Sequence, residues 1–244
     1  MFSQEELSAF LQRGDVHASV FELRHDYRAM LIAVDGVVPG ASDDKSEALL
    51  TAAEVAALDA LRDAALEEIP HVAAWREAYR AFGAKPSRTR NSLEALLRRC
   101  ESGLPRVNRL TDIYNAVSVL HQVPVGGEDL SHYAGPPRLV RAHGNEPFDT
   151  VAGGGAVVEH PDPGEAAWRD EAGVTCRRWN WRQARRTRLR EDTTSAFLVI
   201  DALRPLTDES LWAAGHDLIR HVSALGPDVR VAYRIIANAT EQGD

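Results

Sequence analysis

Three polar side chains lie close together in the sequence at the start of an otherwise apolar segment. Arg109, Asp112 and Asn115 are spaced three residues apart, so on a helix they share one edge. An arginine, a carboxylate and an amide in this arrangement can bond to one another, or they can recognise the polar groups of an amino acid or a ribose. A hydrogen-bond network at the helix start is the simpler alternative, because buried polar groups are usually satisfied locally.

The arginine-rich segment 177–190, RRWNWRQARRTRLR, is a second group of residues that could bind a ligand. Arginine pairs with phosphate through two parallel hydrogen bonds, and an indole ring offers a nucleobase a stacking surface. The alternative is a solvated edge whose arginines pair with acidic residues. If the segment binds RNA, the expected contact residues are Arg178, Trp181, Arg185 and Arg186.

Several familiar catalytic and cofactor motifs are absent from the sequence, including the P-loop, the G-x-S-x-G elbow and H-E-x-x-H. The AGGGA run at 152–156 lacks dinucleotide-binding spacing, and we expect a flexible turn there. His216 and His221 do not share a helix face. Cys100 and Cys176 have neither metal-binding nor redox spacing, which favours free thiols. We expect neither a metal nor a cofactor.

Helices are expected mainly in the first half of the chain and strands mainly in the second. The expected helices are 3–14, 46–68, 72–82, 92–100, 109–122 and 207–225. The expected strands are 16–24, 27–37, 137–142, 156–160, 173–179, 195–203 and 228–237. The nearly continuous apolar run 195–203 is typical of a strand covered on both faces. Pro-Val-Gly-Gly at 124–127 is expected to be a turn. The order of elements predicts a mixed α/β chain without strict βαβ alternation.

Two segments resemble the signatures of one family, the B3/B4 domain in the β subunit of bacterial phenylalanyl-tRNA synthetase. The first signature has V-D-x-x-N followed by Q-P-x-H-A-F-D-L, and LPRVNRLTDIYNAVSVLHQVPVGGEDL at 104–130 is similar to it. The second, S-x-V-T-E-x-T before an apolar strand, is similar to 188–203. The resemblance covers roughly residues 70–240, and 75–99 is similar to the lead-in of free-standing members. The matching positions are Asn108, Asp112, Asn115, Pro124, Asp129, Leu130, Glu191 and Thr193.

The resemblance implies an α+β fold in which layered β-sheets pack on each other with helices on one side. It also implies a concave pocket that accepts the aminoacylated 3′ end of tRNA and hydrolyses tRNA charged with the wrong amino acid. The chain departs from the family where the pocket histidine is replaced by Gly126 and the phenylalanine by Glu128. The residues expected to be catalytic are Asn115, Glu128 and Glu191. Those expected to bind substrate are Arg109, Asp112, Gly126 and Thr193.

Charge is unevenly distributed along the 244 residues. Residues 1–70 hold 5 Lys/Arg against 14 Asp/Glu, whereas the remaining residues hold 23 against 22. We expect 1–70 to be an acidic N-terminal extension of the same unit as a B3/B4-like domain at 71–240. No apolar run is long enough to cross a bilayer, and the N-terminus lacks the pattern of a signal peptide. These features predict a cytoplasmic protein that does not bind a membrane, and the resemblance implies tRNA, and not DNA, as its partner. Two functions stay open: a deacylase and a binding module without catalysis.

Overall fold

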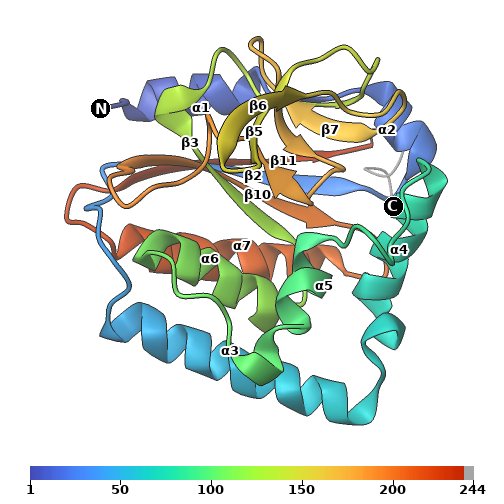
Figure 1. The fold of residues 1–244 in the computed structure, drawn as a ribbon. Helices are drawn as coiled ribbons and strands as arrows, with labels where there is room; N and C mark the ends of the chain where they lie inside the picture. The colour runs from blue at the N-terminus through green and yellow to red at the C-terminus, as the bar shows by residue number, and fades with distance from the viewer. Residues whose placement is uncertain (239–244) are drawn as a thin grey trace.

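A four-stranded antiparallel sheet lies at the centre of the computed structural model, which describes residues 1–238 (Figure 1). Its strand order is β11-β2-β10-β3. The strands are β2 (Arg28–Asp35), β3 (Val125–Asp129), β10 (Ser195–Ala202) and β11 (Arg230–Ala237). Every residue of β2 and β10 is buried. The prediction that 195–203 forms a strand covered on both faces is therefore confirmed.

A second layer of strands covers one face of the central sheet (Figure 1). It consists of a five-stranded sheet of order β1-β4-β7-β8-β9 and a separate β5–β6 hairpin. These strands are β1 (Asp15–Val16), β4 (Arg138–Arg141), β5 (Phe148–Ala152), β6 (Gly155–Glu159), β7 (Ala166–Arg169), β8 (Val174–Arg177) and β9 (Arg182–Gln183). One apolar cluster fills the space between the sheets, where Phe197 and Val199 meet Trp168 and Cys176.

Helices cover the other face of the central sheet in two tiers (Figure 1). The helices α6 (Arg109–Leu120) and α7 (Asp208–Ser223) share an apolar cluster with the sheet, and α3 (Asp44–Asp63) lies beyond them. The other helical segments are α1 (Gln4–Gln12), α2 (Ala18–Leu23), η1 (Leu66–Glu68), α4 (Pro70–Ala81), α5 (Ser92–Leu97), η2 (Cys100–Ser102) and η3 (Leu130–His132). The layers form an α+β fold, as predicted.

Side-chain caps fix where several helices begin. In α1, Ser3 Oγ accepts the backbone N–H of Glu6, and the Glu6 carboxylate accepts the N–H of Ser3. The side-chain oxygens of Asn91, Asn108 and Thr207 likewise accept a backbone N–H in the first turns of α5, α6 and α7. Each cap satisfies a backbone donor that the first turn of the helix leaves unpaired. Ser3 and Thr207, the first residues of the predicted helices 3–14 and 207–225, are thus the N-caps of α1 and α7.

Two of the predicted elements are wrong. The segment 16–24 is not a strand, because only its first residue belongs to β1 and Ala18–Leu23 forms a helix. The ring of His17 accepts the N–H of Ser19 and so caps that helix. Pro-Val-Gly-Gly at 124–127 is not a turn either, because Val125–Asp129 pairs with β10 as an edge strand of the central sheet.

The two glycines of β3 face opposite sides of the sheet. A Cβ on Gly127 would lie 2.8 Å from Tyr114 Cε1, 2.9 Å from Leu189 Cδ1 and 3.0 Å from Leu198 Cδ2. A Cβ on Gly126 would meet only Gln183 Nε2, at 3.5 Å. Gly127 therefore lets the helical layer pack closely on β3, whereas Gly126 leaves space on the side of the other sheet.

We expect Gly127→Ala to lower the free energy of unfolding by about 1–3 kcal/mol, because its methyl group would overpack the contact with α6. Gly126→Ala is the matched control and should change the stability by less than about 0.5 kcal/mol. Urea denaturation of both variants checks this. Equal stability of the two variants would contradict the assignment of the two faces.

Candidate functional site

A small pocket lies between the two sheets, and we call it the intersheet pocket. Strands β3 and β10 form one wall, and β7, β8 and the segment 179–183 form the other. The cavity has a volume of about 20 Å³, which is room for about one water molecule. Its lining is apolar around Trp168, Trp179 and Phe197, and two carboxyl groups, of Glu128 and Asp201, interrupt that lining.

Glu128 is the buried carboxyl of this pocket that keeps an unused oxygen. The Tyr133 hydroxyl donates to Oε2, while Oε1 has no hydrogen-bond partner among the described residues. Burial raises the pKa of Glu128 to about 7, against the lowering effect of the Tyr133 and Thr175 hydroxyls. A carboxyl group that ionises near neutral pH and has a free oxygen can accept a proton from a bound water.

Asp201 is the second buried carboxyl, and both of its oxygens are occupied. The Tyr27 hydroxyl donates to Oδ1 at 2.5 Å, and the Asn180 amide donates to Oδ2 at 3.2 Å. Burial raises the pKa of Asp201 to about 7. Asp201 thus anchors Tyr27 and Asn180 beside the pocket, whereas Glu128 has an oxygen available for a ligand.

The wall opposite Glu128 depends on a turn with an uncommon backbone. Arg178 and Trp179 are consecutive residues with positive φ, at 48° and 68°. Such conformations are rare for residues other than glycine and cost of order 1–3 kcal/mol each. The turn directs Trp179 into the pocket lining, where it is fully buried, and leaves Arg178 partly exposed. Hydrogen bonds from Arg178 N to Glu165 and from Trp179 N to Ala166 O hold the turn.

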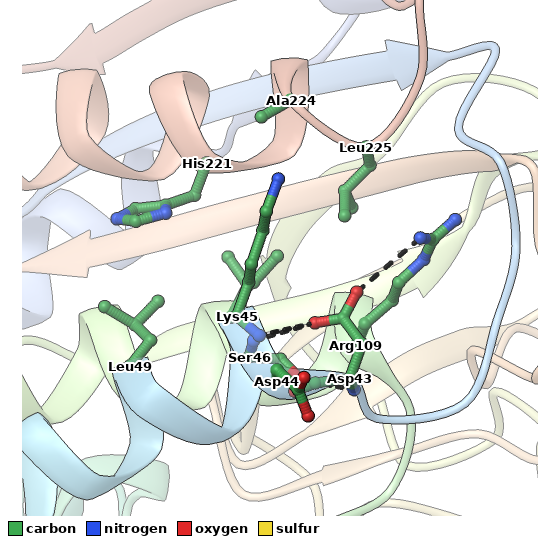
Figure 2. Close-up of a pocket in the computed structure, with 10 residues that line it drawn as sticks. Asp43, Asp44, Lys45, Ser46, Leu49, Arg109, His221, Ala224 and Leu225 are labelled. Carbon is green, nitrogen blue, oxygen red and sulfur yellow. Dashed lines mark hydrogen bonds and ion pairs between the residues drawn. The ribbon is translucent and has the colours of Figure 1, made fainter.

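Arg109 lies in a different hollow, on the helical side of the molecule, which we call the interhelix pocket (Figure 2). This pocket has a volume of about 310 Å³ between α3, α6 and α7. Arg109 donates to the backbone carbonyls of Val38 and Pro39 and pairs with Asp43 at 3.7 Å. Asp43 is itself the N-cap of α3. The guanidinium of Arg109 is therefore committed to fixing the loop before α3.

Asp112 belongs to a hydrogen-bond network at the start of α6. Its carboxylate accepts bonds from the Ser42 hydroxyl at 2.5 Å, from Val107 N at 2.9 Å and from the Ser46 hydroxyl at 3.4 Å. These bonds join the loop before α3 to the first turn of α6. Asp112 thus belongs to a local hydrogen-bond network at the helix start, which was the simpler alternative to ligand binding.

The expected convergence of Arg109, Asn115, Gly126 and Glu191 does not occur. Arg109 lines the interhelix pocket and Gly126 the intersheet pocket, while Asn115 is buried in α6 outside both. Glu191 is exposed on the turn before β10. The physical reason is that the central sheet separates the pockets: Gly127 faces α6, and its neighbour Gly126 faces away.

Thr193 supports β3 from the same turn. Its hydroxyl donates to Asp129 Oδ2 at 2.8 Å and accepts the N–H of Arg190 at 3.0 Å. Asp129 follows Glu128 directly, so Thr193 fixes the end of the strand that carries the unpartnered carboxyl group. Thr193 therefore holds β3 in place through Asp129, the residue that follows Glu128.

The arginines of segment 177–190 are largely paired with carboxylates. Arg186 binds Asp170 through two bonds of 2.9 Å, and Arg185 binds Asp149 at 3.1 Å. The other ion pairs of the segment are Arg177–Glu165, Arg177–Glu159, Arg178–Asp162, Arg178–Glu165 and Arg182–Glu159. The structure thus contains the pairing with acidic residues that was the alternative to RNA binding.

Trp181 is also occupied. The guanidinium groups of Arg178 and Arg182 lie 4.6 Å and 4.7 Å from its ring centroid. Such cation–π contacts compete with a nucleobase for the face of the indole. RNA contacts by Arg178, Trp181, Arg185 and Arg186 stay a prediction, and each would have to displace an existing partner.

Within residues 1–238, no group of three or more His, Cys, Asp and Glu side chains is arranged to hold a metal ion. Both cysteines are free and buried. In the same part of the chain, no helix is long and apolar enough to cross a membrane.

A comparison of the chain with known families identifies the family to which it belongs. The model of the B3/4 domain matches residues 74–211, which is more than half of the chain, and the protein therefore belongs to this family. The resemblance inferred from the two signatures is confirmed.

Thirteen chains of solved structures match the protein. One is an N-terminal fragment of the phenylalanyl-tRNA synthetase β-subunit from Pyrococcus horikoshii, with 11% sequence identity and a TM-score of 0.44. The match covers 89% of this chain and 49% of that one, so the protein spans about half of that fragment's length. No curated protein matches the chain.

Several residues of the intersheet pocket are missed by motif analysis. Asp201 does leave a signal, because it is the one carboxylate inside the apolar run 195–203. A carboxylate in a strand covered on both faces must be buried, and a buried carboxyl has a perturbed pKa. Trp168 leaves no comparable signal, since it reaches the pocket only through long-range packing.

The two buried carboxyl groups predict a stability that falls as the pH rises. The pKa of Glu128 and of Asp201 is about 7, against ordinary values of 4.5 and 3.8. A raised pKa means that the protonated form stabilises the fold fully below the ordinary value, and that this contribution is lost as the pH rises through 7. The ionisation of Glu128 should lower the free energy of unfolding by roughly 3 kcal/mol between about pH 4 and pH 8, and Glu128→Gln should abolish this decrease.

Urea unfolding of the wild type, Glu128→Gln and Asp201→Asn at several pH values measures this effect. Each variant should show a flatter dependence of stability on pH than the wild type. An unchanged dependence in both variants would mean that neither carboxyl group has a raised pKa.

Proposed function

We propose that this protein binds the aminoacylated 3′ end of a tRNA and hydrolyses the ester to a wrongly attached amino acid. Membership of the B3/4 family supports a role related to tRNA synthetases, and the two sequence signatures resemble an editing domain. Because tRNA is found in the cytoplasm, this proposal implies that the protein acts in the cytoplasm.

The observation that carries the proposal is the unpartnered Oε1 of Glu128. An aminoacyl ester is already activated, so its hydrolysis needs a positioned water, an acceptor for the proton of that water and donors for the developing oxyanion. With a pKa of about 7, the Glu128 carboxylate is basic enough to accept the proton and is substantially ionised at neutral pH. No nucleophilic side chain is required.

The surroundings of Glu128 suit this role. Gly126 lies two residues away on the same face of β3 and leaves space on that side. The side-chain atom nearest to that space is Gln183 Nε2. The Gln183 amide can donate a hydrogen bond to an ester oxygen that enters there. The apolar walls exclude further water, which strengthens each electrostatic contact inside the pocket.

Under this proposal Glu128 is the general base, whereas Arg109 and Asp112 support α6 and the loop before α3, and Asn115 is a buried residue of α6. Thr193 positions β3 through Asp129. Glu191, exposed on its turn, is a rival for the catalytic carboxylate and can be tested as such.

We expect Glu128→Gln to slow the release of amino acid from a mischarged tRNA by about 10²-fold or more, the usual contribution of a general base. The wild-type rate should rise with pH to a plateau above about pH 7, because only the deprotonated carboxylate accepts a proton, and Glu128→Gln should lose this limb. A panel of mischarged tRNAs, assayed under single-turnover conditions, provides the measurement.

Glu191→Gln is the comparison for this experiment. A full rate in Glu128→Gln and a strong loss in Glu191→Gln would transfer the catalytic role to the exposed turn and contradict the assignment to Glu128. Circular dichroism and thermal melting of both variants separate catalytic loss from loss of the fold.

A second function, binding of tRNA or of an amino-acid-like ligand without hydrolysis, is favoured by one observation. The intersheet pocket holds only about 20 Å³, because Trp168, Trp179 and Phe197 fill the space between the sheets. Binding of tRNA without release of amino acid from any member of the panel would support this alternative.

A further inference from the structure

A second hollow lies next to the intersheet pocket, on the outer side of the turn at Arg178 and Trp179. It is formed by the loop 82–89 that follows α4, by the segment 162–165 and by Arg178, and we call it the loop hollow. Its volume is about 400 Å³. It is much larger than the intersheet pocket and is open to solvent at the exposed residues Lys85, Arg88 and Asp162.

Lys85 and Arg88 are cations without partners. Both side chains are exposed and line the hollow, and neither makes an ion pair or a hydrogen bond with any residue in the described range 1–238. The backbone that carries them is nevertheless fixed. Lys85 O accepts the N–H groups of Arg88 at 2.8 Å and of Thr89 at 2.9 Å, and Pro86 between them is buried. The loop thus presents two free positive charges from an ordered turn.

The arginine-rich segment offers no such charges at Arg185 and Arg186. Arg186 is bound through two bonds to Asp170, whose side chain is fully buried, and Arg185 pairs with Asp149. A phosphate group that bound Arg186 would leave a buried carboxylate without its counterion, which is costly. Lys85 and Arg88 can bind a phosphate without breaking any contact.

The acidic residues of the loop hollow are unequal. Glu165 is neutralised, because Arg177 binds both of its oxygens, at 2.9 Å and 2.6 Å. Asp162 is highly exposed, and among residues 1–238 its side chain pairs only with Arg178, at 3.4 Å. An exposed pair of this kind is weak. Asp162 is therefore the remaining charge that opposes an anion in the hollow.

The turn at Arg178 and Trp179 connects the two sites. Arg178 lines the loop hollow and Trp179 lines the intersheet pocket, so consecutive residues belong to the two cavities. Because consecutive residues line the two cavities, an RNA strand whose backbone lies in the loop hollow would have its end close to the intersheet pocket.

We propose that the loop hollow binds a backbone phosphate of tRNA through Lys85 and Arg88, and that this contact directs the 3′ end to the intersheet pocket. The inference rests on the proposed function and adds the surface that recognises the nucleic acid. It assigns RNA docking to residues 82–89 and not to the paired Arg185 and Arg186.

The test is the dissociation constant of the full chain for uncharged tRNA, measured by filter binding over a series of salt concentrations. The double variant Lys85→Ala with Arg88→Ala should weaken binding about tenfold or more at low salt. It should also lower the slope of log affinity against log salt by about 1–2, since each lost phosphate contact removes roughly 0.7–0.9 of the slope.

Two further variants make the test specific. The double variant Arg13→Ala with Arg138→Ala removes the same charge from other exposed positions, and it should change the affinity by less than about twofold. Asp162→Asn removes the opposing charge and should tighten binding at least about twofold. Thermal melting confirms that every variant is folded.

The inference is overturned if the Lys85/Arg88 variant binds like the wild type, if the Arg13/Arg138 variant weakens binding equally, or if Asp162→Asn weakens binding. Its failure is distinguishable from failure of the proposed function. In the deacylation assay, the Lys85/Arg88 variant should raise KM and keep kcat. Loss of binding in this variant, with no hydrolysis by the wild type, would uphold the docking surface and refute the deacylase.

Discussion

The alternation of side chains along β3 and β10 is the constraint on which the site depends. Antiparallel pairing places Glu128 beside Phe197 and Gly126 beside Val199, and residues of successive pairs point to opposite faces of the sheet. Phe197, Val199 and Asp201 therefore face the second sheet, while Leu198 and Ile200 pack with the helices. A shift of the register by one residue would turn the carboxyl groups into the helical layer. The pairing thus decides that two ionisable groups enter the space between the sheets.

Burial of carboxyl groups opposes stability, and hydrogen bonds offset this cost more fully for Asp201 than for Glu128. Asp201 has both oxygens hydrogen-bonded, by Tyr27 and Asn180. Glu128 has one oxygen bonded by Tyr133 and the other free. A group that is incompletely satisfied and has a raised pKa is a feature typical of functional sites. The two positive-φ residues on the opposite wall are a second feature of this kind.

Much of the fold could be predicted from the sequence, because its signals are local. The apolar run 195–203 predicts a buried strand, and Ser3 and Thr207 predict helix starts through capping chemistry. The site is harder to predict. The spacing of Arg109, Asp112 and Asn115 predicts one helix edge, but spacing does not reveal which layer that edge meets. The central sheet separates Arg109 from Gly126, and only the tertiary arrangement contains that fact.

The arginine-rich segment is also ambiguous in the sequence for a physical reason. Its partners Asp149, Glu165 and Asp170 lie in other strands and turns, so their pairing with the arginines appears only after folding. Lys85 and Arg88, whose side chains have no partner in the described range 1–238, stand in a loop whose sequence has no nucleic-acid motif. In this protein, the charges that are free to bind a ligand are identified by their missing partners and not by their density in the sequence.

The central claim is that Glu128 is a buried carboxyl group poised to accept a proton near neutral pH. Its most direct test is titration of the glutamate side-chain carboxyl carbons by NMR, in protein labelled with ¹³C-glutamate and with Glu128→Gln used to assign the signal. The account predicts that the Glu128 signal titrates with a midpoint near 7. A midpoint near the ordinary value of 4.5 would contradict it.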